Sequence, residues 1–228
     1  MIRRCVDVFV SAAGLVAAAP LLACIALLVR LTSGPPVFFF QRRAGLGGVP
    51  FRIIKFRTMC VRGEELGGSL TFQGDRRITT VGRFLRRHKL DELPQLLNVL
   101  RGEMTLIGPR PEVLDWVERY TPEQREALTA KPGLSDPVQL VFRHEHDFLT
   151  TASEYEQLVA VKVHRQIAYL RSRTVLSDLA TAASTLRAFF PSRPSAEELA
   201  AYSAIRAAEP PRASTEAKPE AGVPRKVP

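Results

Sequence analysis

The feature that most constrains this chain is a long uncharged, apolar stretch near its N-terminus. No Asp, Glu, Lys or Arg occurs over the 22 residues from Val8 to Val29. An α-helix rises about 1.5 Å per residue and the hydrocarbon core of a bilayer is about 30 Å thick, so a helix of this length can cross a membrane. The sequence therefore predicts a membrane-associated N-terminal helix.

Three interpretations of this stretch remain open from its residues. Arg3 and Arg4, followed by an apolar run and then Leu21–Cys24, resemble a cleaved lipoprotein signal, although apolar residues continue beyond that point. A spanning helix is the simplest alternative, but basic residues flank both of its ends. In the third interpretation, Pro20 bends the helix into a re-entrant hairpin that returns Arg30 to the starting side of the membrane.

The positive charge is concentrated in the same part of the chain. The formal net charge is +9, and residues 1–62 contribute +8 of it through nine basic residues and one acid, Asp7. A protein that coats nucleic acid would be basic throughout, so the distribution disfavours that class. The three cysteines form no C-x-x-C pair, which excludes a disulfide scaffold and a cysteine zinc site.

Two strands are predicted after the apolar segment. Ser33–Pro36 ends the helix, and both Val37–Gln41 and Phe51–Met59 have strand-like composition, with a glycine-rich turn between them. A period of two places Lys55 and Arg57 on one face of the second strand. Two neighbouring cations suit a diphosphate, and a solvated edge strand is the alternative.

The candidate catalytic residues lie in the next segment. Leu93, Leu96 and Leu97 have helical spacing, which places Asp91 and Glu92 near the start of a helix. Asp91 is either a simple N-cap or a carboxylate at a positive helix end where phosphates and a divalent metal meet. The arginines that precede it are Arg76, Arg83, Arg86 and Arg87.

Several ordered motifs resemble those of the bacterial polyprenyl-phosphate phosphoglycosyl transferases, a monotopic sugar-transferase family. The most specific is DELPQLLNVLRGEMTLIGPRPE, residues 91–112. Shorter or weaker matches lie at residues 3–7, 33–48, 53–59, 75–87 and 131–137, so the resemblance covers roughly residues 3–190.

The resemblance implies transfer of a sugar-1-phosphate from a UDP-sugar to undecaprenyl phosphate, or another polyprenyl phosphate, with release of UMP. It implies Mg²⁺ as cofactor, with Asp91 and Glu92 as metal ligands, and a phospho-aspartate formed on Asp91 as nucleophile. Glu92 would assist as metal ligand or in proton transfer. The candidate substrate-binding residues are Lys55, Arg57 and Arg76 for the diphosphate, and Arg110 and Pro111, which match a family motif, for the nucleotide or a phosphate.

The resemblance also implies a place at the membrane. The hydrophobic segment of the family is a re-entrant helix broken at a Ser-Pro pair, where this chain has Ala19 and Pro20. We expect a monotopic protein at the cytoplasmic face of the bacterial inner membrane, acting in an exopolysaccharide or other glycoconjugate pathway. Nucleic acid is not an expected partner, and a homodimer is one option. The bases expected to face anionic headgroups are Arg3, Arg4, Arg30, Arg42 and Arg43.

Two further features are specific to this chain. Lys89 stands where the family commonly has serine, and an additional cation there would help to keep Asp91 ionised. His144–Asp147 has two histidines two residues apart, which would meet only on a strand, so we interpret this segment as a polar surface turn rather than a metal site. Arg143 is a weaker candidate for contact with an anion.

The predicted fold is α+β and mostly helical, with a membrane helix-break-helix, a short β-hairpin, and helices packed around the active site and on the membrane surface. Helical spacing predicts helices over residues 153–171 and 175–190, each either in the core or on the membrane. The predicted parts are a re-entrant hairpin over 1–33, a catalytic domain over 34–190, a peripheral segment over 191–206 and a disordered tail over 207–228.

A non-enzymatic protein is the alternative function. Such a protein would be tethered to the membrane and would bind anionic lipid or nucleic acid through its basic face. The basic residues lack the interleaved aromatics that stack on bases, apart from Phe51 and Phe56, which weakens the nucleic-acid version.

Overall fold

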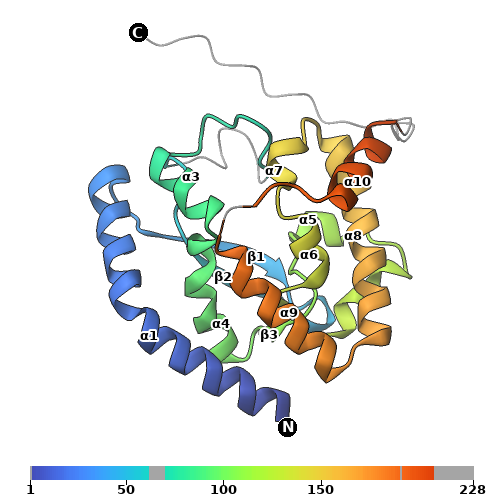
Figure 1. Cartoon of the computed structure of the whole chain (residues 1–228), viewed down its shortest axis with the longest axis horizontal. Helices are drawn as coiled ribbons and strands as arrows, with labels where there is room; N and C mark the ends of the chain where they lie inside the picture. The colour runs from blue at the N-terminus through green and yellow to red at the C-terminus, as the bar shows by residue number, and fades with distance from the viewer. Residues whose placement is uncertain (1, 62–69, 191, 208–228) are drawn as a thin grey trace.

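The apolar N-terminal stretch forms one long helix, α1 (Ile2–Ser33). The structure is a computed structural model and describes residues 2–61, 70–190 and 192–207. Helix α1 curves along one side of the molecule and bends near its middle (Figure 1). Pro20 lies inside it, where a proline removes one backbone hydrogen bond and bends a helix that continues beyond it. The predicted helix-break-helix is therefore corrected to a single bent helix.

The first turns of α1 are fastened to the rest of the chain by two charged side chains. Arg4 donates hydrogen bonds to the carbonyl oxygens of Val99 (2.5 Å) and Leu100 (2.7 Å), near the end of helix α4 (Leu96–Arg101). Asp7 accepts from the start of strand β3 (Thr105–Ile107). The prediction that Arg4 faces lipid headgroups is wrong, because unsatisfied carbonyls at a helix C-terminus bind its guanidinium instead.

The predicted hairpin is confirmed with shifted bounds. Strand β1 (Phe38–Ala44) pairs antiparallel with β2 (Pro50–Phe56), and the short 3₁₀-helix η1 (Leu46–Gly48) joins them. One face of the hairpin packs on the second half of α1. Ile25 and Val29 of α1 are buried against Phe56 of β2, and Leu85, which lies between residues 80 and 87, completes this cluster.

A second, smaller sheet lies beyond the hairpin. Strand β3 runs parallel to β4 (Gly133–Ser135). Gly108 and Gly133 lie in backbone contact here, since a Cβ added to Gly133 would lie 2.2 Å from the amide nitrogen of Gly108. Only glycine allows two backbones to approach this closely, and the contact holds the segment after β3 against β4.

Helices make up most of the remaining chain. The short ones are α3 (Thr80–Arg87), the 3₁₀-helix η2 (Leu90–Gln95), α4, α5 (Leu114–Val117), the 3₁₀-helix η3 (Gln124–Thr129), α6 (Pro137–Val141) and α7 (Glu145–Phe148). The longer ones are α8 (Ala152–Ser172), α9 (Val175–Ala188) and α10 (Ala196–Ala207). The helices predicted over 153–171 and 175–190 are thus confirmed as α8 and α9.

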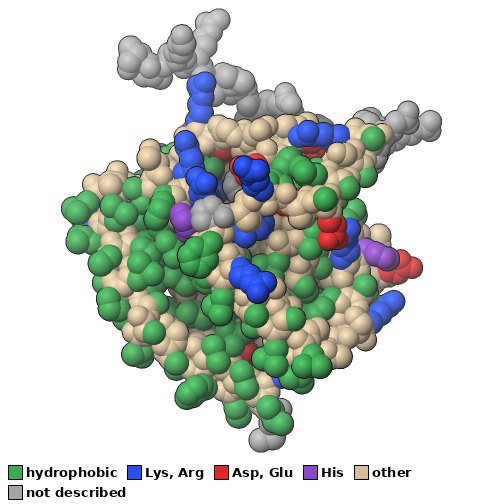
Figure 2. All heavy atoms as spheres, in the orientation of Figure 1, with side chains coloured by type: hydrophobic (Ala, Val, Ile, Leu, Met, Phe, Trp, Pro, Cys, Tyr) green, Lys and Arg blue, Asp and Glu red, His purple; other side chains and the backbone are tan. Residues whose placement is uncertain are grey.

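Helices α8 and α9 differ in where their apolar residues point. Helix α8 buries Leu158, Val159 and Val163 in the core. The apolar side chains of α9 are largely exposed, with Leu186 at 68% and Leu176 at 78%. Hydrophobic side chains spread over the left and lower parts of the face in Figure 2, where α1 lies. Exposed apolar faces of this kind mark contact with a membrane or partner.

Helix α10 covers most of the segment that the sequence places at the periphery. Tyr202 and Ile205 are buried in one cluster with Phe142 and Leu158. This helix therefore belongs to the packed body. The predicted tail lies outside the described residues from residue 208 onward, and Ala207 is the last residue of α10.

The docking of α1 through Arg4 makes a testable prediction. Arg4→Ala should destabilise the protein by roughly 2 kcal/mol, a fall in Tm of about 4–8 °C, because two carbonyls lose a charged donor. The matched control is Arg3→Ala, because the exposed Arg3 approaches Asp178 only to 3.5 Å and such pairs contribute little. Thermal unfolding followed by circular dichroism in detergent micelles measures both. Equal effects of the two changes would contradict the docking role of Arg4.

Candidate active site

A pocket of about 500 Å³ opens between the hairpin, the start of η2 and helix α7. Its volume lies in the range of sites for small organic ligands. The charged residues that line it are Arg43, Lys55, Arg57, Arg86, Lys89, Asp91, Glu92, Arg110, Glu112 and Glu145. Cations outnumber carboxylates in this lining, which suits an anionic ligand.

Asp91 lies in the first turn of η2, with its side chain against the pocket. The residue is only 7% exposed, and its carboxylate forms no hydrogen bond within the part of the chain that the structure describes. The N-cap position of η2 belongs to Lys89, so the interpretation of Asp91 as a simple N-cap is wrong. A buried carboxylate that faces a pocket without a partner is available to a ligand or a reacting group.

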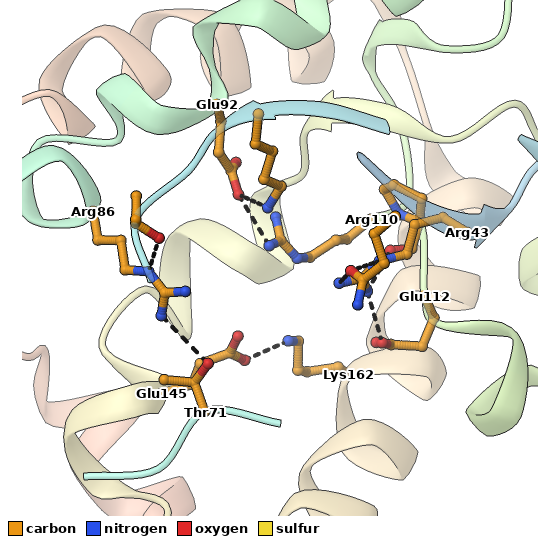
Figure 3. A network of polar contacts seen from close by, with 12 residues as sticks. Arg43, Thr71, Arg86, Glu92, Arg110, Glu112, Glu145 and Lys162 are labelled. Carbon is orange, nitrogen blue, oxygen red and sulfur yellow. Dashed lines mark hydrogen bonds and ion pairs between the residues drawn. The ribbon is translucent and has the colours of Figure 1, made fainter. Parts of the chain in front are cut away.

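Glu92, by contrast, is held by two cations. Its Oε1 atom accepts a hydrogen bond from Lys55 Nζ at 2.6 Å and another from an Arg110 guanidinium nitrogen at 3.1 Å. Figure 3 shows Glu92 reaching from η2 toward Arg110. The structure thus brings together four of the residues predicted from sequence: Lys55, Asp91, Glu92 and Arg110.

The pKa values of the two neighbouring carboxyl groups are shifted in opposite directions. Burial, reinforced by the negative charge of Glu92, raises the pKa of Asp91 above its ordinary value. Burial also acts to raise the pKa of Glu92, but the charges of Arg110 and Lys55 outweigh it and hold that pKa well below the ordinary value. Two titratable groups with separated pKa values are a usual feature of active sites.

Buried polar side chains hold Lys55 and Arg110 in place. Asn98 accepts from the backbone amide of Ile54 (3.1 Å) and donates to the carbonyl of Arg52 (2.7 Å), which fixes β2 against α4. Asp136 is fully buried and accepts from the backbone amide of Arg110 (3.1 Å). These contacts keep both cations beside Glu92.

A second polar group lies at the other end of the pocket. Arg43 donates to Glu112 at 3.2 Å, and the Tyr155 hydroxyl donates to the same carboxylate oxygen at 3.0 Å. Arg43 also donates to the carbonyl of Pro111 at 3.3 Å. The prediction that Arg43 faces lipid headgroups is therefore wrong, because the period of β1 turns its side chain toward Glu112. Pro111 itself lies outside the lining of this pocket.

Glu145 is a pocket residue that the sequence interpretation missed. Its carboxylate pairs with Lys162 Nζ at 2.7 Å (Figure 3). Burial acts to raise the pKa of Glu145, but the charges of Lys162 and Arg110 outweigh it and lower that pKa to about 2. The predicted surface turn is wrong here, because α7 turns Glu145 inward and His144 bonds Glu198 at 2.9 Å.

Three predicted substrate-binding residues lie in other settings. Arg57 lines the pocket, but its guanidinium donates to the carbonyls of three residues at the end of α1 and just beyond it, Ser33–Pro35, at 2.6 to 2.8 Å. Arg76 is exposed and does not line the pocket. Arg143 donates to the carbonyls of Ala188 (2.6 Å) and Phe190 (3.2 Å), at the end of α9.

Of the arginines on α3, one lines the pocket and two do not. Arg86 lines the pocket and donates to the hydroxyls of Thr58 (2.8 Å) and Thr71 (3.3 Å) (Figure 3). Arg83 and Arg87 are exposed and point elsewhere on α3. The helical period of α3 therefore selects one of these three cations for the pocket.

The acidic residues fit a metal only in part. Within the described ranges, no group of three or more His, Cys, Asp or Glu side chains could hold a metal ion. Asp91 and Glu92 do offer two adjacent carboxylates in a pocket for an anion. Mg²⁺ is often held by one or two carboxylates together with substrate phosphates and water, and this donor set suits that mode.

Known proteins and one family model are similar to this chain in sequence. The family described as "Bacterial sugar transferase" matches residues 1–192. A UDP-glucose:undecaprenyl-phosphate glucose-1-phosphate transferase from Caulobacter vibrioides is 39% identical over 180 residues, covering 78% of this chain and 65% of that protein. A UDP-N-acetylgalactosamine-undecaprenyl-phosphate N-acetylgalactosaminephosphotransferase from Aeromonas hydrophila is 34% identical over 189 residues, covering 82% and 43%.

A third relative is close to this chain in length. The exopolysaccharide production protein ExoY of Sinorhizobium fredii is 35% identical over 206 residues, covering 84% of this chain and 86% of that protein. The matched region thus spans less than two thirds of the first two relatives but nearly all of the third.

Proposed function

Because the chain belongs to the bacterial sugar transferase family, we propose that it transfers a sugar-1-phosphate from a UDP-sugar to undecaprenyl phosphate and releases UMP. The names of two relatives describe transfer of this kind, and a third is named for exopolysaccharide production. The observation that carries the proposal is Asp91, a buried carboxylate without a partner among the described residues, in a pocket lined by cations.

In the first step, a carboxylate oxygen of Asp91 attacks the phosphorus atom that bears the sugar. The bond between this phosphorus and the bridging oxygen breaks, UMP leaves with that oxygen, and a phospho-aspartate remains. A covalent intermediate divides one difficult transfer into two easier ones. Cations that line the pocket, among them Lys55, Arg86 and Arg110, stabilise the charge on the transferring group.

In the second step, a phosphate oxygen of the lipid acceptor attacks the same phosphorus. The bond from phosphorus to Asp91 breaks, the carboxylate is restored, and the product is a lipid diphosphosugar. Asp91 is a good leaving group here because the aspartyl phosphate is a mixed anhydride.

Glu92 acts mainly through the cations that it binds. Its ion pairs keep Lys55 and Arg110 at the edge of the pocket, where their remaining donors can meet a diphosphate. Mg²⁺, held by Asp91 and Glu92, would neutralise phosphate charge when bound. The separate acidities of the two carboxyl groups suit a division between nucleophile and charge-binding residue.

The proposed location is the cytoplasmic face of the bacterial inner membrane, with α1 as a re-entrant segment. Both ends of α1 contact the same body, since Arg4 binds the end of α4 and Arg57 binds the carbonyls of Ser33–Pro35. The ends of a straight spanning helix would lie on opposite sides of the bilayer, where one body could not hold both. The largely exposed α9 would then lie at the membrane surface.

Replacement of the nucleophile gives the first test of this function. Asp91→Asn should lower the rate of UMP release from UDP-sugar by about 10³-fold or more, because an amide does not form the covalent intermediate. The control is Asp115→Asn, at an exposed position outside the pocket. Purified protein, undecaprenyl phosphate and a panel of UDP-sugars are used with Mg²⁺. Full activity of Asp91→Asn would rule out the proposed nucleophile.

The pH dependence of the first step tests the pairing of Asp91 with Glu92. UMP release in a single turnover should fall as the pH drops through the raised pKa of Asp91, because protonation removes the nucleophile. In Glu92→Gln this acid limb should move to lower pH, since a negative neighbour is lost while Lys55 and Arg110 stay positive. An unmoved limb, or one that moves to higher pH, would contradict this electrostatic account.

Cysteine labelling tests the topology. In a variant with Cys5, Cys24 and Cys60 replaced by serine, a single cysteine is introduced at Ile2 or at Arg42, both exposed and on either side of the apolar stretch. Both should resist a membrane-impermeant thiol reagent in spheroplasts and react after permeabilisation. Labelling of the two positions from opposite sides would show a spanning helix and overturn the re-entrant proposal.

A further inference from the structure

A second, smaller pocket lies on the other side of Glu92 from the ligand-sized one. Its volume is about 80 Å³, too small for a nucleotide. The apolar residues that line it are Leu93, Leu134, Leu140, Ala188 and Phe189. Lys89 and Glu92 line both pockets, so the two spaces meet at these side chains beside Asp91.

The small pocket adjoins the exposed apolar surface of α9. Ala188 ends α9 and Phe189 follows it, and both line the pocket. The neighbouring Leu186 and Phe190 are 68% and 73% exposed. An apolar path therefore leads from the proposed membrane surface to the edge of the active site.

Lys89 carries a free cation at the junction. Its side chain is half-buried and forms no hydrogen bond or ion pair with any residue that the structure describes, whereas the more deeply placed Lys55 and Lys162 are both paired. The ammonium group therefore remains available to an anion at the point where the two pockets meet.

The backbone at Lys89 is strained. Its φ angle is +55°, and among the described residues it is the only non-glycine with a positive φ. This position directly follows α3 and its C-cap, where glycine is usual because other side chains are disfavoured in the left-handed conformation. Strained backbone positions of this kind cluster at functional sites, which makes the side chain of Lys89 a candidate for a functional role.

We propose that Lys89 binds the phosphate of the lipid acceptor while the small pocket holds the first isoprene unit of its chain. This inference rests on the proposed function, in which the acceptor is undecaprenyl phosphate. Such a molecule joins an apolar chain to a phosphate, as the small pocket joins an apolar wall to a free ammonium group. The donor then occupies the large pocket, with its diphosphate at Lys55 and Arg110.

Lys89 takes no part in bond making or breaking. It holds the acceptor phosphate so that one of its oxygens can attack the phosphorus on Asp91, and the Asp91 carboxylate then leaves. The ammonium group also offsets the repulsion between the incoming phosphate and the two neighbouring carboxyl groups. Its loss should therefore weaken acceptor binding far more than donor binding.

Lys89→Gly is the most informative variant, because glycine fits the left-handed backbone and removes the cation without disturbing the turn. Its KM for undecaprenyl phosphate in detergent micelles should rise about tenfold or more, while its KM for UDP-sugar changes by less than about threefold. Lys89→Arg should restore much of the acceptor affinity because it restores the charge. The matched control is Arg87→Ala, an exposed cation two residues away, which should change neither constant.

The apolar wall is tested separately by Ala188→Leu, which fills the small pocket. This change should raise the KM for undecaprenyl phosphate, whereas Ala183→Leu on the exposed side of α9 should not. Equal effects of the two changes would count against the pocket as the site of the chain.

Exchange of labelled UMP into UDP-sugar, measured on wild-type protein without acceptor, separates the two levels of the proposal. Absence of both exchange and lipid product would overturn the proposed function itself. Normal wild-type activity together with an unchanged acceptor KM in Lys89→Gly would overturn the inference about Lys89 alone. A larger rise in the donor KM than in the acceptor KM would assign Lys89 to the donor and also overturn it.

Discussion

The buried contact of Glu92 with Lys55 and Arg110 is the interaction on which the site depends. It joins strand β2, the start of η2 and the segment after β3, which lie apart in sequence. Removal of one partner from such a buried group leaves an uncompensated charge, at a typical cost of about 3–5 kcal/mol. The same contact lowers the pKa of Glu92 while the pKa of Asp91 is raised. The packing of three segments and the protonation of the pocket's carboxyl groups therefore depend on one set of ion pairs.

The membrane helix is part of this arrangement rather than a separate anchor. Arg4 binds the end of α4, which continues directly from the helix that carries Asp91, and Ile25 and Val29 pack against the hairpin that carries Lys55. A shift of α1 in the bilayer would therefore move both walls of the pocket. In the proposed reaction, this connection places the lipid surface at a fixed distance from the nucleophile.

Local patterns in the sequence predicted much of the fold and half of the site. Periods of two and of 3.6 residues predicted the hairpin, α8 and α9, and the motif around Asp91 and Glu92 placed two neighbouring carboxyl groups that the structure brings to the pocket. The contacts that were missed join distant residues: Arg4 with Val99, Arg57 with Ser33, and Glu145 with Lys162. No spacing within one helix or strand encodes these contacts. From the sequence alone, an arginine that binds backbone carbonyls therefore cannot be distinguished from one that faces phosphate.

The central claim is that Asp91 becomes covalently bonded to the sugar phosphate. Incubation of the purified protein with UDP-sugar and Mg²⁺ in the absence of lipid, followed by rapid acid quenching and peptide mass spectrometry, tests it directly. The account predicts that the peptide containing Asp91 gains the mass of one sugar phosphate, and that undecaprenyl phosphate added before the quench removes it. UMP release with no modified peptide, or modification at a different residue, would contradict the account.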